Sequence, residues 1–328
     1  MKDIYLLNNG RLQRKDSTIY FVNEDGSKKV VPIEQVENLH VFGEMDFNTS
    51  FFNLLNQKDV SLHIYNYYGF YSGSYTPRKK KVSGFVDVKQ SEYYLNAQYR
   101  MYIAKQFILS SIHHMVRNLR RHKEQTAPLI DQIIEMKNQV SAASDIQTLM
   151  GIEGKTRLFY YQGFNGIIKN PDFNFIKREK RPPSDPINAL ISFGNSLMYT
   201  AVLSEIYKTQ LNPTISYLHQ PSSRRFSLSL DIAEIFKPLI VDGLIFYLIN
   251  NRIIRLEHFE FIEKQICLLN EQGKKIFIKE FEAKMRTTVK HRKLNRNTSY
   301  RYFIRLECYK LIKHLIGDED YISLKAWW

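Results

Sequence analysis

The sequence is poor in cysteine and lacks long apolar runs. Cys267 and Cys308 are the only cysteines among 328 residues, and neither stands in a CxxC or Cys/His zinc-binding spacing. This usage predicts a chain without a disulfide framework, as is typical of a reducing compartment. The longest apolar segment, 239–249, is interrupted by Asp242 and Gly243 and is shorter than the ~20 residues that cross a bilayer. Since no signal-peptide pattern is visible at the start, the sequence predicts a cytoplasmic protein without a membrane partner.

Acidic residues are scarce relative to basic ones. The chain has 33 Asp and Glu against 47 Lys and Arg, a net charge of +14. The excess is uneven, since residues 1–85 hold 11 basic and 9 acidic side chains (net +2), which leaves 36 and 24 (net +12) for the remainder. This balance favours a polyanion such as nucleic acid, bound by the second part of the chain. A generally basic protein with no nucleic-acid role is the alternative interpretation.

The apolar pattern changes its period along the chain. Alternating apolar residues and turn signals, with one short helix at 49–57, predict strands at 3–7, 18–22, 29–33, 36–41, 60–65 and 70–75. Apolar residues at helical spacing then predict helices at 94–121, 129–140, 145–162, 187–208, 228–250, 259–269, 275–290 and 299–316. The sequence therefore predicts an α+β protein, with a small β-rich N-terminal domain (1–85) and a larger all-α C-terminal domain (86–328).

Two glycines flank a carboxylate inside one predicted helix. Gly151 and Gly154 lie on either side of Glu153, and a glycine in a helix interior costs roughly 1 kcal/mol relative to alanine. Their presence indicates that something approaches the backbone closely there, such as a phosphate chain or another helix. Tight helix packing with Glu153 left in solvent is the simpler interpretation of this pattern alone.

A histidine and two acids lie close together further along the chain. Asp231 and Glu234 are three residues apart in a predicted helix and share a face, and His219 lies just upstream on an expected turn. These donors suit a divalent cation such as Mg²⁺ or Mn²⁺, whereas zinc would require further His or Cys ligands. An ordinary amphipathic helix with solvated acids explains the spacing equally well.

Cations gather near these acids and near the end of the chain. Arg224, Arg225 and Lys237 lie beside the acid pair, which suits a site that a phosphate must enter. The segment 286–305 holds seven Lys and Arg and no acid, interleaved with aromatic residues, which is typical of a surface that follows a nucleic-acid backbone. A solvated helix face is the alternative. The predicted DNA contacts are Arg178, Arg181, Arg224, Arg225, Lys237, Arg286, Lys290, Arg292, Lys293 and Arg296.

The motifs match one family when they are taken together. In chain order they are Pro32-Ile33-Glu34, Val41-Phe42-Gly43, Gly151-Ile152-Glu153-Gly154, the segment 181–190, His219 and the segment 227–238. This order, over essentially the whole length, resembles the universal integrase subunit of CRISPR adaptation, the first CRISPR-associated protein ("Cas-one"). A β-rich N-terminal domain for dimerisation or partner docking and a helical catalytic domain are what the resemblance implies.

The resemblance also implies a site and a reaction. It places metal ligands at Glu153, His219 and Glu234, with Asp231 as an acidic neighbour and Mg²⁺ or Mn²⁺ as the ion. It implies a homodimer that assembles with a small second adaptation protein ("Cas-two"). In that assembly, a 3′-hydroxyl of a captured DNA fragment would attack a phosphodiester of the CRISPR array.

Two other functions remain open from the sequence. A structure-selective nuclease of DNA repair would use the same site, and a catalytically silent DNA-binding dimer would share the fold. Retention of Glu153, His219 and Glu234 disfavours the silent dimer. A neighbouring gene for a small partner, beside a repeat array, would separate the repair nuclease from the integrase.

Overall fold

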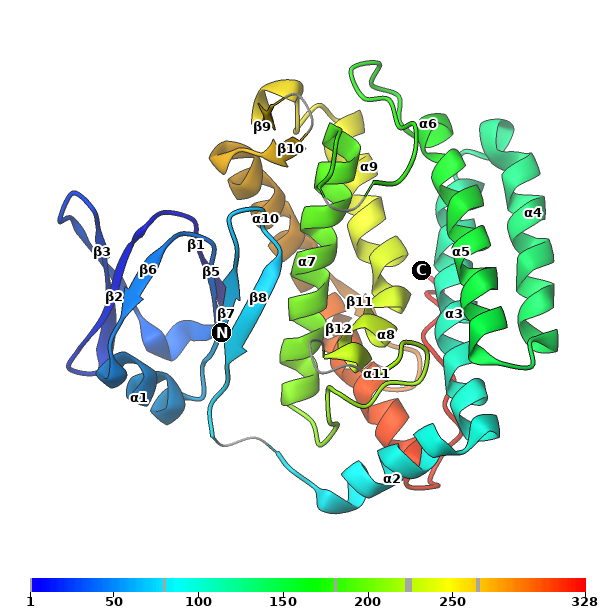
Figure 1. Ribbon diagram of the computed structural model, residues 1–328, viewed down its shortest axis with the longest axis horizontal. Coiled ribbons are helices and arrows are strands. Elements are labelled where there is room, and N and C mark those ends of the chain that lie inside the picture. Colours follow the sequence, from blue (N-terminus) through cyan, green and yellow to red (C-terminus); the bar gives the residue numbers. More distant parts are fainter. Residues whose placement is uncertain (1, 79–80, 180–181, 222–225, 264–265) are drawn as a thin grey trace. The chain divides into compact units, whose positions relative to one another are not determined.

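The computed structural model describes residues 2–78, 81–179, 182–221, 226–263 and 266–328. The chain divides into two compact units, Met1–Lys81 and Val82–Trp328, whose elements are drawn in Figure 1. The first unit is built mainly of strands and the second mainly of helices, so the expected α+β class is confirmed. Of the helices in the described ranges, none combines the length and apolar character that crossing a membrane requires.

The N-terminal unit contains two sheets and one α-helix. Its elements are β1 (Lys2–Leu6), β2 (Gly10–Lys15), β3 (Thr18–Asn23), β4 (Lys28–Val31), the 3₁₀ turn η1 (Ile33–Gln35), β5 (Val36–Val41), β6 (Met45–Phe47), α1 (Thr49–Lys58), β7 (Ser61–Tyr65) and β8 (Tyr71–Tyr75). One sheet has the order β1-β5-β7-β8, with β1, β5 and β7 parallel and β8 antiparallel to β7. The other has the order β4-β3-β2-β6, in which only β2 and β6 pair in parallel.

Helix α1 anchors the apolar core of this unit. The Asn48 side chain accepts a hydrogen bond from the Phe51 N–H at 2.9 Å and caps the first turn. The left-handed backbone of Asp59 (φ 57°) ends the helix. Phe51, Leu54 and Leu55 are buried in the same core as apolar side chains of β2, β5 and β7. Truncation of Phe51 to alanine would cost about 3–5 kcal/mol of stability.

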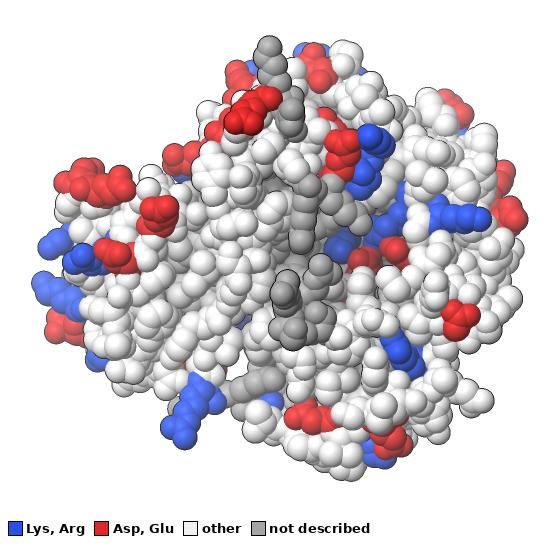
Figure 2. Space-filling model, viewed as in Figure 1, with Lys and Arg blue, Asp and Glu red and all other residues white. Residues whose placement is uncertain are grey.

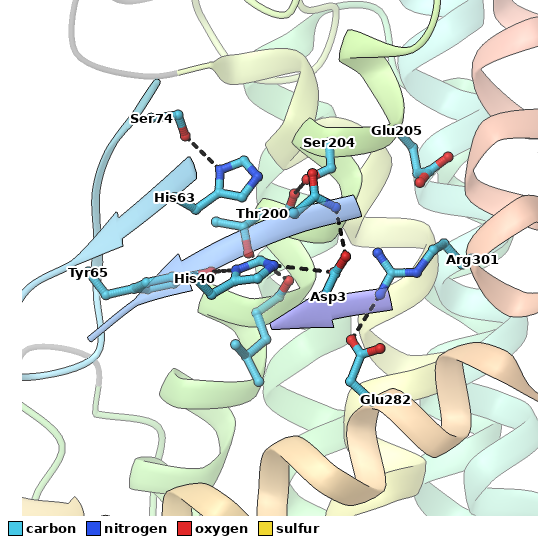
Figure 3. Close-up of polar contacts among 12 residues, drawn as sticks. Asp3, His40, His63, Tyr65, Ser74, Thr200, Ser204, Glu205, Glu282 and Arg301 are labelled. Carbon is cyan, nitrogen blue, oxygen red and sulfur yellow. Dashed lines mark hydrogen bonds and ion pairs between the residues drawn. The ribbon is translucent and has the colours of Figure 1, made fainter. Parts of the chain in front are cut away.

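A row of polar side chains runs across the sheet that contains β1, as Figure 3 shows. His40 lies between Asp3 and Tyr65, with Nε2 3.2 Å from Asp3 Oδ2 and Nδ1 2.9 Å from the Tyr65 hydroxyl. His63 Nδ1 lies 2.6 Å from Ser74 Oγ. A buried polar group without a partner costs free energy, so these bonds let the sheet bury its polar residues.

The C-terminal unit contains helices and two short hairpins. Its elements are α2 (Gly84–Leu95), α3 (Ala97–Arg120), α4 (Lys123–Ala142), α5 (Ile146–Gln162), α6 (Phe164–Ile167), α7 (Pro186–Tyr207), α8 (Ser227–Phe236), the π-helical turn η2 (Lys237–Asp242), α9 (Gly243–Asn250), the 3₁₀ turn η3 (Leu256–His258), β9 (Phe259–Ile262), β10 (Ile266–Leu269), α10 (Glu271–Arg286), β11 (Thr288–Lys290), β12 (Asn297–Ser299) and α11 (Tyr300–Leu315). Helix α3 packs against α4, α5, α8 and η2, and α7 packs against α8, η2 and α11.

The structure corrects three expectations for this unit. The segment 259–269, expected to be helical, is instead a hairpin in which Phe259 pairs with Leu269 and Ile262 with Ile266. The left-handed backbone of Glu263 (φ 51°) ends β9, and β10 is a short apolar strand that is mostly buried. The helix expected at 94–121 begins at 97, because the Asn96 side chain caps α3 and ends α2 there. The helix expected at 275–290 is α10, and residues 288–290 form a strand.

Helix α7 approaches η2 and α10 very closely at one position. A Cβ atom added to Gly194 would lie 2.5 Å from Val241 Cγ1 and 2.9 Å from the ring of Phe277. Only glycine fits between these side chains, since real Cβ contacts are essentially never so short. The predicted apolar run 239–249 is therefore interior helix, and α7 lies directly against it.

The segment after α11 runs back over α3 and is tied to α8. The His114 ring bridges the two, because its Nδ1 lies 2.9 Å from the Ile235 carbonyl oxygen and its Nε2 accepts a hydrogen bond from the Ala326 N–H at 3.0 Å. Burial, with smaller contributions from the charges of His113 and Arg117, lowers the pKa of His114 to about 3. A neutral imidazole with Nδ1–H fits both bonds.

Candidate active site

Helix α5 positions Glu153. The Asp145 carboxylate accepts hydrogen bonds from the N–H and hydroxyl of Thr148, both at 2.8 Å, and starts the helix. Leu149, Ile152 and other apolar residues of α5 are buried. The neighbouring Glu153 side chain is only 22% exposed. The carboxylate is therefore held at the rim of the core and is not a solvated surface acid.

The two glycines beside Glu153 leave open space. Gly151 and Gly154 are exposed, and a Cβ added to either would meet nothing within 4 Å. Close packing of another helix of this chain is thus excluded as the reason for these glycines among the described residues. The backbone next to Glu153 is open to a molecule from outside, as the phosphate-chain interpretation requires.

Asp231 holds the turn that carries His219. Its side chain is fully buried, and its Oδ2 accepts hydrogen bonds from the N–H groups of Tyr217 (2.7 Å) and Leu218 (2.9 Å). Its Oδ1 accepts from the His219 N–H at 3.0 Å and lies 2.8 Å from His219 Nδ1. Donation from Nδ1 leaves Nε2 as the ring nitrogen with a lone pair, an arrangement common for metal-binding histidines. Asp231, expected as an acid on the Glu234 face, therefore orients His219 from within the core.

Arg157 joins the two glutamates. It lies one turn after Glu153 on α5, and its Nε contacts Glu153 Oε1 while its Nη2 contacts Glu234 Oε2. The other oxygen of Glu234 accepts a hydrogen bond from Lys237 Nζ at 2.7 Å. On the face drawn in Figure 2, basic and acidic side chains lie next to one another in a recess beside α5. The fold thus brings residues 153 and 234, distant in sequence, to one guanidinium.

Burial and charge act against each other in this cluster. Burial acts to raise the pKa of Glu153, but the charge and hydrogen bond of Arg157, with smaller contributions from Lys237 and His219, lower it overall. Burial acts to lower the pKa of Arg157, yet nearby acids led by Glu153 raise it above its ordinary value. Burial and the charge of Arg157 lower the pKa of Lys237 to about 8.

A second layer lies beneath the two cations. Burial raises the pKa of Asp242 to about 6, an effect that the charges of Arg157 and Lys237 partly offset. Asp242 also makes a hydrogen bond with Tyr160, whose hydroxyl accepts another from Asn118 Nδ2 at 2.8 Å. The π-helical turn η2 carries both Lys237 and Asp242 into this network, and such turns often occur at functional sites.

The donor set of this cluster fits a divalent cation. Two largely buried carboxylates already converge on one positive group, and an oriented imidazole lies within electrostatic reach. Oxygen donors with one imidazole suit Mg²⁺ or Mn²⁺. Among the residues that the structure describes, however, no set of three or more His, Cys, Asp or Glu side chains already has the arrangement of a metal site. Arg157 lies between the two carboxylates and contacts both of them.

The expected DNA contacts near the site differ in their surroundings. Arg178 donates to Asn188 Oδ1 (2.7 Å) and Ser192 Oγ (3.0 Å), so its guanidinium anchors the loop before α7. Lys237 is largely buried and paired with Glu234. Three other expected contacts, Arg181, Arg224 and Arg225, lie outside the described residues.

The expected contacts near the end of the chain lie on the β11–β12 hairpin and next to it. Arg286, Lys290, Arg292, Lys293 and Arg296 are all exposed. Arg286 has a weak ion pair with Glu282 (3.6 Å), and within the described ranges the other four show no ion pair. The Arg292 guanidinium lies 4.9 Å from the Trp327 ring and that of Arg296 lies 5.3 Å from the Tyr302 ring. This surface combines unpaired cations with aromatic rings, as nucleic-acid-binding surfaces do.

Sequence reasoning missed Arg157 and Asp242. The spacing of Arg157, four residues after Glu153, was a usable signal, because side chains at i and i+4 meet on a helix. The signal for Asp242 was its place inside the apolar run 239–249, since an acid that is buried needs a charged or hydrogen-bonding partner. Both residues belong to the same charge cluster as the expected ligands.

Comparison with known proteins identifies relatives over the whole chain. The family model described as "CRISPR associated protein Cas1" matches residues 4–283. The CRISPR-associated endonuclease Cas1 of Clostridium perfringens is 58% identical over 329 residues, covering 100% of this chain and 99% of that protein. This chain is therefore similar to a curated relative along the full length of both.

Solved structures resemble the fold just as completely. A CAS1 protein from Thermotoga maritima, 42% identical, superposes with a TM-score of 0.90 over 98% of this chain and 100% of its own. A casposase bound to an integration product superposes with a TM-score of 0.90 over 100% of this chain and 94% of its own. At 18% identity, the casposase shows a shared fold alone.

Proposed function

Since the chain belongs to the Cas1 family of CRISPR-associated endonucleases, we propose that it joins captured DNA fragments to a CRISPR array by metal-dependent phosphoryl transfer. The nucleophile is a 3′-hydroxyl of the fragment, or water when the enzyme acts as a nuclease. Glu153, His219 and Glu234 hold Mg²⁺ or Mn²⁺. The convergence of Glu153 and Glu234 on one positive group, with His219 nearby, carries this proposal.

The residues of the chain divide the chemical work. When bound, a divalent cation lowers the pKa of the attacking hydroxyl and offsets charge on the phosphate oxygens. Asp231 fixes the ring orientation of His219 through Nδ1. Lys237 sits 2.7 Å from Glu234, where its charge helps a phosphate to approach the two carboxylates. The open backbone at Gly151 and Gly154 gives DNA room to reach Glu153.

The partners follow from the reaction and from the relatives. We propose that the chain forms a homodimer, binds DNA and assembles with a small second adaptation protein, since similar folds occur in structures named as Cas1–Cas2 complexes. The N-terminal unit provides the dimerisation and docking surface, and the β11–β12 hairpin contacts the DNA backbone. Because the reaction uses chromosomal DNA, its compartment is the cytoplasm.

An integration assay tests the proposal directly. Purified protein, its small partner, a labelled fragment with free 3′-hydroxyls and a repeat-bearing plasmid should give joined product with Mg²⁺ or Mn²⁺. EDTA should stop the reaction and added Mn²⁺ should restore it. A fragment with 3′-deoxy ends should give no joining. Joining in chelator would overturn metal catalysis, and cleavage of branched DNA without any joining would favour a repair nuclease.

A further inference from the structure

Arg157 occupies an unusual position between the two proposed acidic ligands. One guanidinium contacts both Glu153 and Glu234, and the side chain is only 16% exposed. Lys237 contacts the remaining oxygen of Glu234. The charges of these two cations and two carboxylates thus balance one another in the protein alone.

A metal ion and Arg157 need the same oxygens. Arginine does not lose its proton in proteins, so the charge of Arg157 persists. Two positive groups cannot share the pair without repulsion. Metal binding therefore requires the guanidinium to leave at least one carboxylate.

Open space for the displaced guanidinium lies nearby on α5. A long side chain on a helix leans toward the N-terminal turn, which places Arg157 over the turn of Glu153 and Gly154. Nothing lies within 4 Å of a Cβ added to Gly154. A DNA phosphate that enters this space would meet the guanidinium and could accept two hydrogen bonds from it.

We propose that Arg157 is a positioning residue that holds Glu153 and Glu234 together without metal and gives way to the ion when a DNA phosphate takes its guanidinium. This rests on the proposed function, because Glu153 and Glu234 must be metal ligands. Two consequences follow. DNA and metal bind cooperatively in the wild type, since each favours the withdrawn arginine. Removal of the guanidinium strengthens metal binding in the absence of DNA.

Mn²⁺ titration of the full-length protein tests this. Free Mn²⁺ is followed by electron paramagnetic resonance, with and without a short DNA duplex that carries 3′-deoxy ends. The wild type should bind Mn²⁺ on the order of tenfold more tightly when DNA is present. Arg157→Gln should bind Mn²⁺ on the order of tenfold more tightly than the wild type without DNA, and DNA should then add little. A merely structural arginine would leave metal affinity unchanged or weaker.

Two further variants serve as controls for the Mn²⁺ titration. Arg301→Gln is the matched control, because Arg301 is a largely buried arginine paired with a glutamate, Glu282, outside the cluster. It should behave as the wild type does in both titrations. Arg157→Lys keeps the charge but not the two-pronged guanidinium, so its Mn²⁺ affinity should lie between those of wild type and Arg157→Gln. If Arg157→Gln fails to fold, the Mn²⁺ affinity of Arg157→Lys tests the proposal in its place.

The outcomes separate this inference from the proposed function. Equal Mn²⁺ affinity of the wild type and both Arg157 variants would overturn the role of Arg157 alone. Absence of Mn²⁺ binding by every protein, with DNA present, would overturn the ligand set itself. Mn²⁺ affinity that rises in Arg157→Gln and still depends on DNA as in the wild type would refute the transfer of the guanidinium to phosphate.

Discussion

Two groups of cations in the helical unit differ in every respect except their charge. Arg157 and Lys237 are largely buried, and each contacts a carboxylate. Arg292 and Lys293 on the β11–β12 hairpin are exposed, and the described part of the chain offers them no acid partner. In the protein alone the first pair is already paired with carboxylates, whereas the second pair is available to a polyanion.

Positive charge serves two purposes in this unit. Exposed cations attract a nucleic-acid backbone and cause release of its counterions, so their effect weakens with salt. Buried cations are screened little, and their energy depends on whether their partner is present. Removal of a carboxylate beside Arg157 or Lys237 should therefore lower the rate of DNA joining. Added salt should instead weaken the binding of DNA by Arg292 and Lys293.

The largest effect is expected when a carboxylate that contacts Arg157, or the imidazole of His219, is removed. Glu153→Ala, His219→Ala or Glu234→Gln should lower strand joining on the order of 10²-fold or more, because each loses a proposed metal ligand. DNA affinity, measured by filter binding, should stay close to that of the wild type. Glu135→Ala, an exposed acid on α4, is the control and should join normally. Normal joining by any one site variant would remove that residue from the centre.

His114 is also buried but, among the described residues, its ring bonds to backbone groups and forms no ion pair with a carboxylate. Its native pKa is about 3 against an ordinary 6.5, so between these pH values the unfolded chain binds a proton that the native protein excludes. Stability should be full above pH 6.5 and should fall as the pH drops below it, by up to about 1.4 kcal/mol per pH unit.

Urea unfolding between pH 4 and 7 measures this contribution. His114→Gln cannot titrate but retains a donor and an acceptor, so its stability should depend less on pH than that of the wild type over this range. Identical pH dependence of the two proteins would contradict the low native pKa of His114.

The exposed cations of the β11–β12 hairpin are tested by measuring DNA affinity at several salt concentrations. Arg292→Gln/Lys293→Gln should lower the slope of log affinity for duplex DNA against log salt by up to about 2, since each phosphate contact contributes about 0.9. Lys28→Gln/Lys29→Gln removes the same charge from exposed β4 of the other unit and should leave the slope unchanged. If both double variants shift the slope equally, overall charge and not the hairpin governs DNA binding.

Substitution of the exposed Gly151 should change protein stability and joining activity in opposite directions. Gly151→Ala should raise the free energy of unfolding by about 0.5–1 kcal/mol, because the new methyl group meets nothing and alanine favours the helix. The same change should lower joining about tenfold if DNA approaches there. Gly194→Ala is the opposite case, since its methyl group would clash with Val241 and destabilise the fold. Thermal melts of both variants measure the changes in stability, and the joining assay measures the loss of activity in Gly151→Ala.

Local sequence patterns predicted much of the fold but little of the charge network. Helical spacing identified α5, α7 and α8 because their apolar faces are continuous. The same reasoning failed at 259–269, because its short apolar runs fit either a helix or a strand and pairing within the hairpin decides the outcome. Asn96 broke a predicted helix because a side-chain cap is a local feature that apolar spacing does not report.

The candidate ligands came from motifs, whereas their environment came from the fold. Spacing placed Asp231 and Glu234 on one helix but did not predict that both are buried, since burial depends on what packs around α8. The contact of Arg157 with Glu234 joins separate helices, so nothing in the local sequence reports it. Arg178 shows the converse, because a cation expected at DNA donates to Asn188 and Ser192.

Deletion of a single residue from η2 would let that turn relax to an ordinary α-helix, because a π-helical turn holds one residue more. The helix would persist and its flanks would keep their relative orientation, because the wide turn absorbs the extra residue. Lys237 and Asp242, which are five residues apart, would become four apart and would still share a face of the helix. The charge network is therefore expected to tolerate this deletion better than the loss of one residue from α5, after which every later side chain of that helix would rotate by about 100° about its axis.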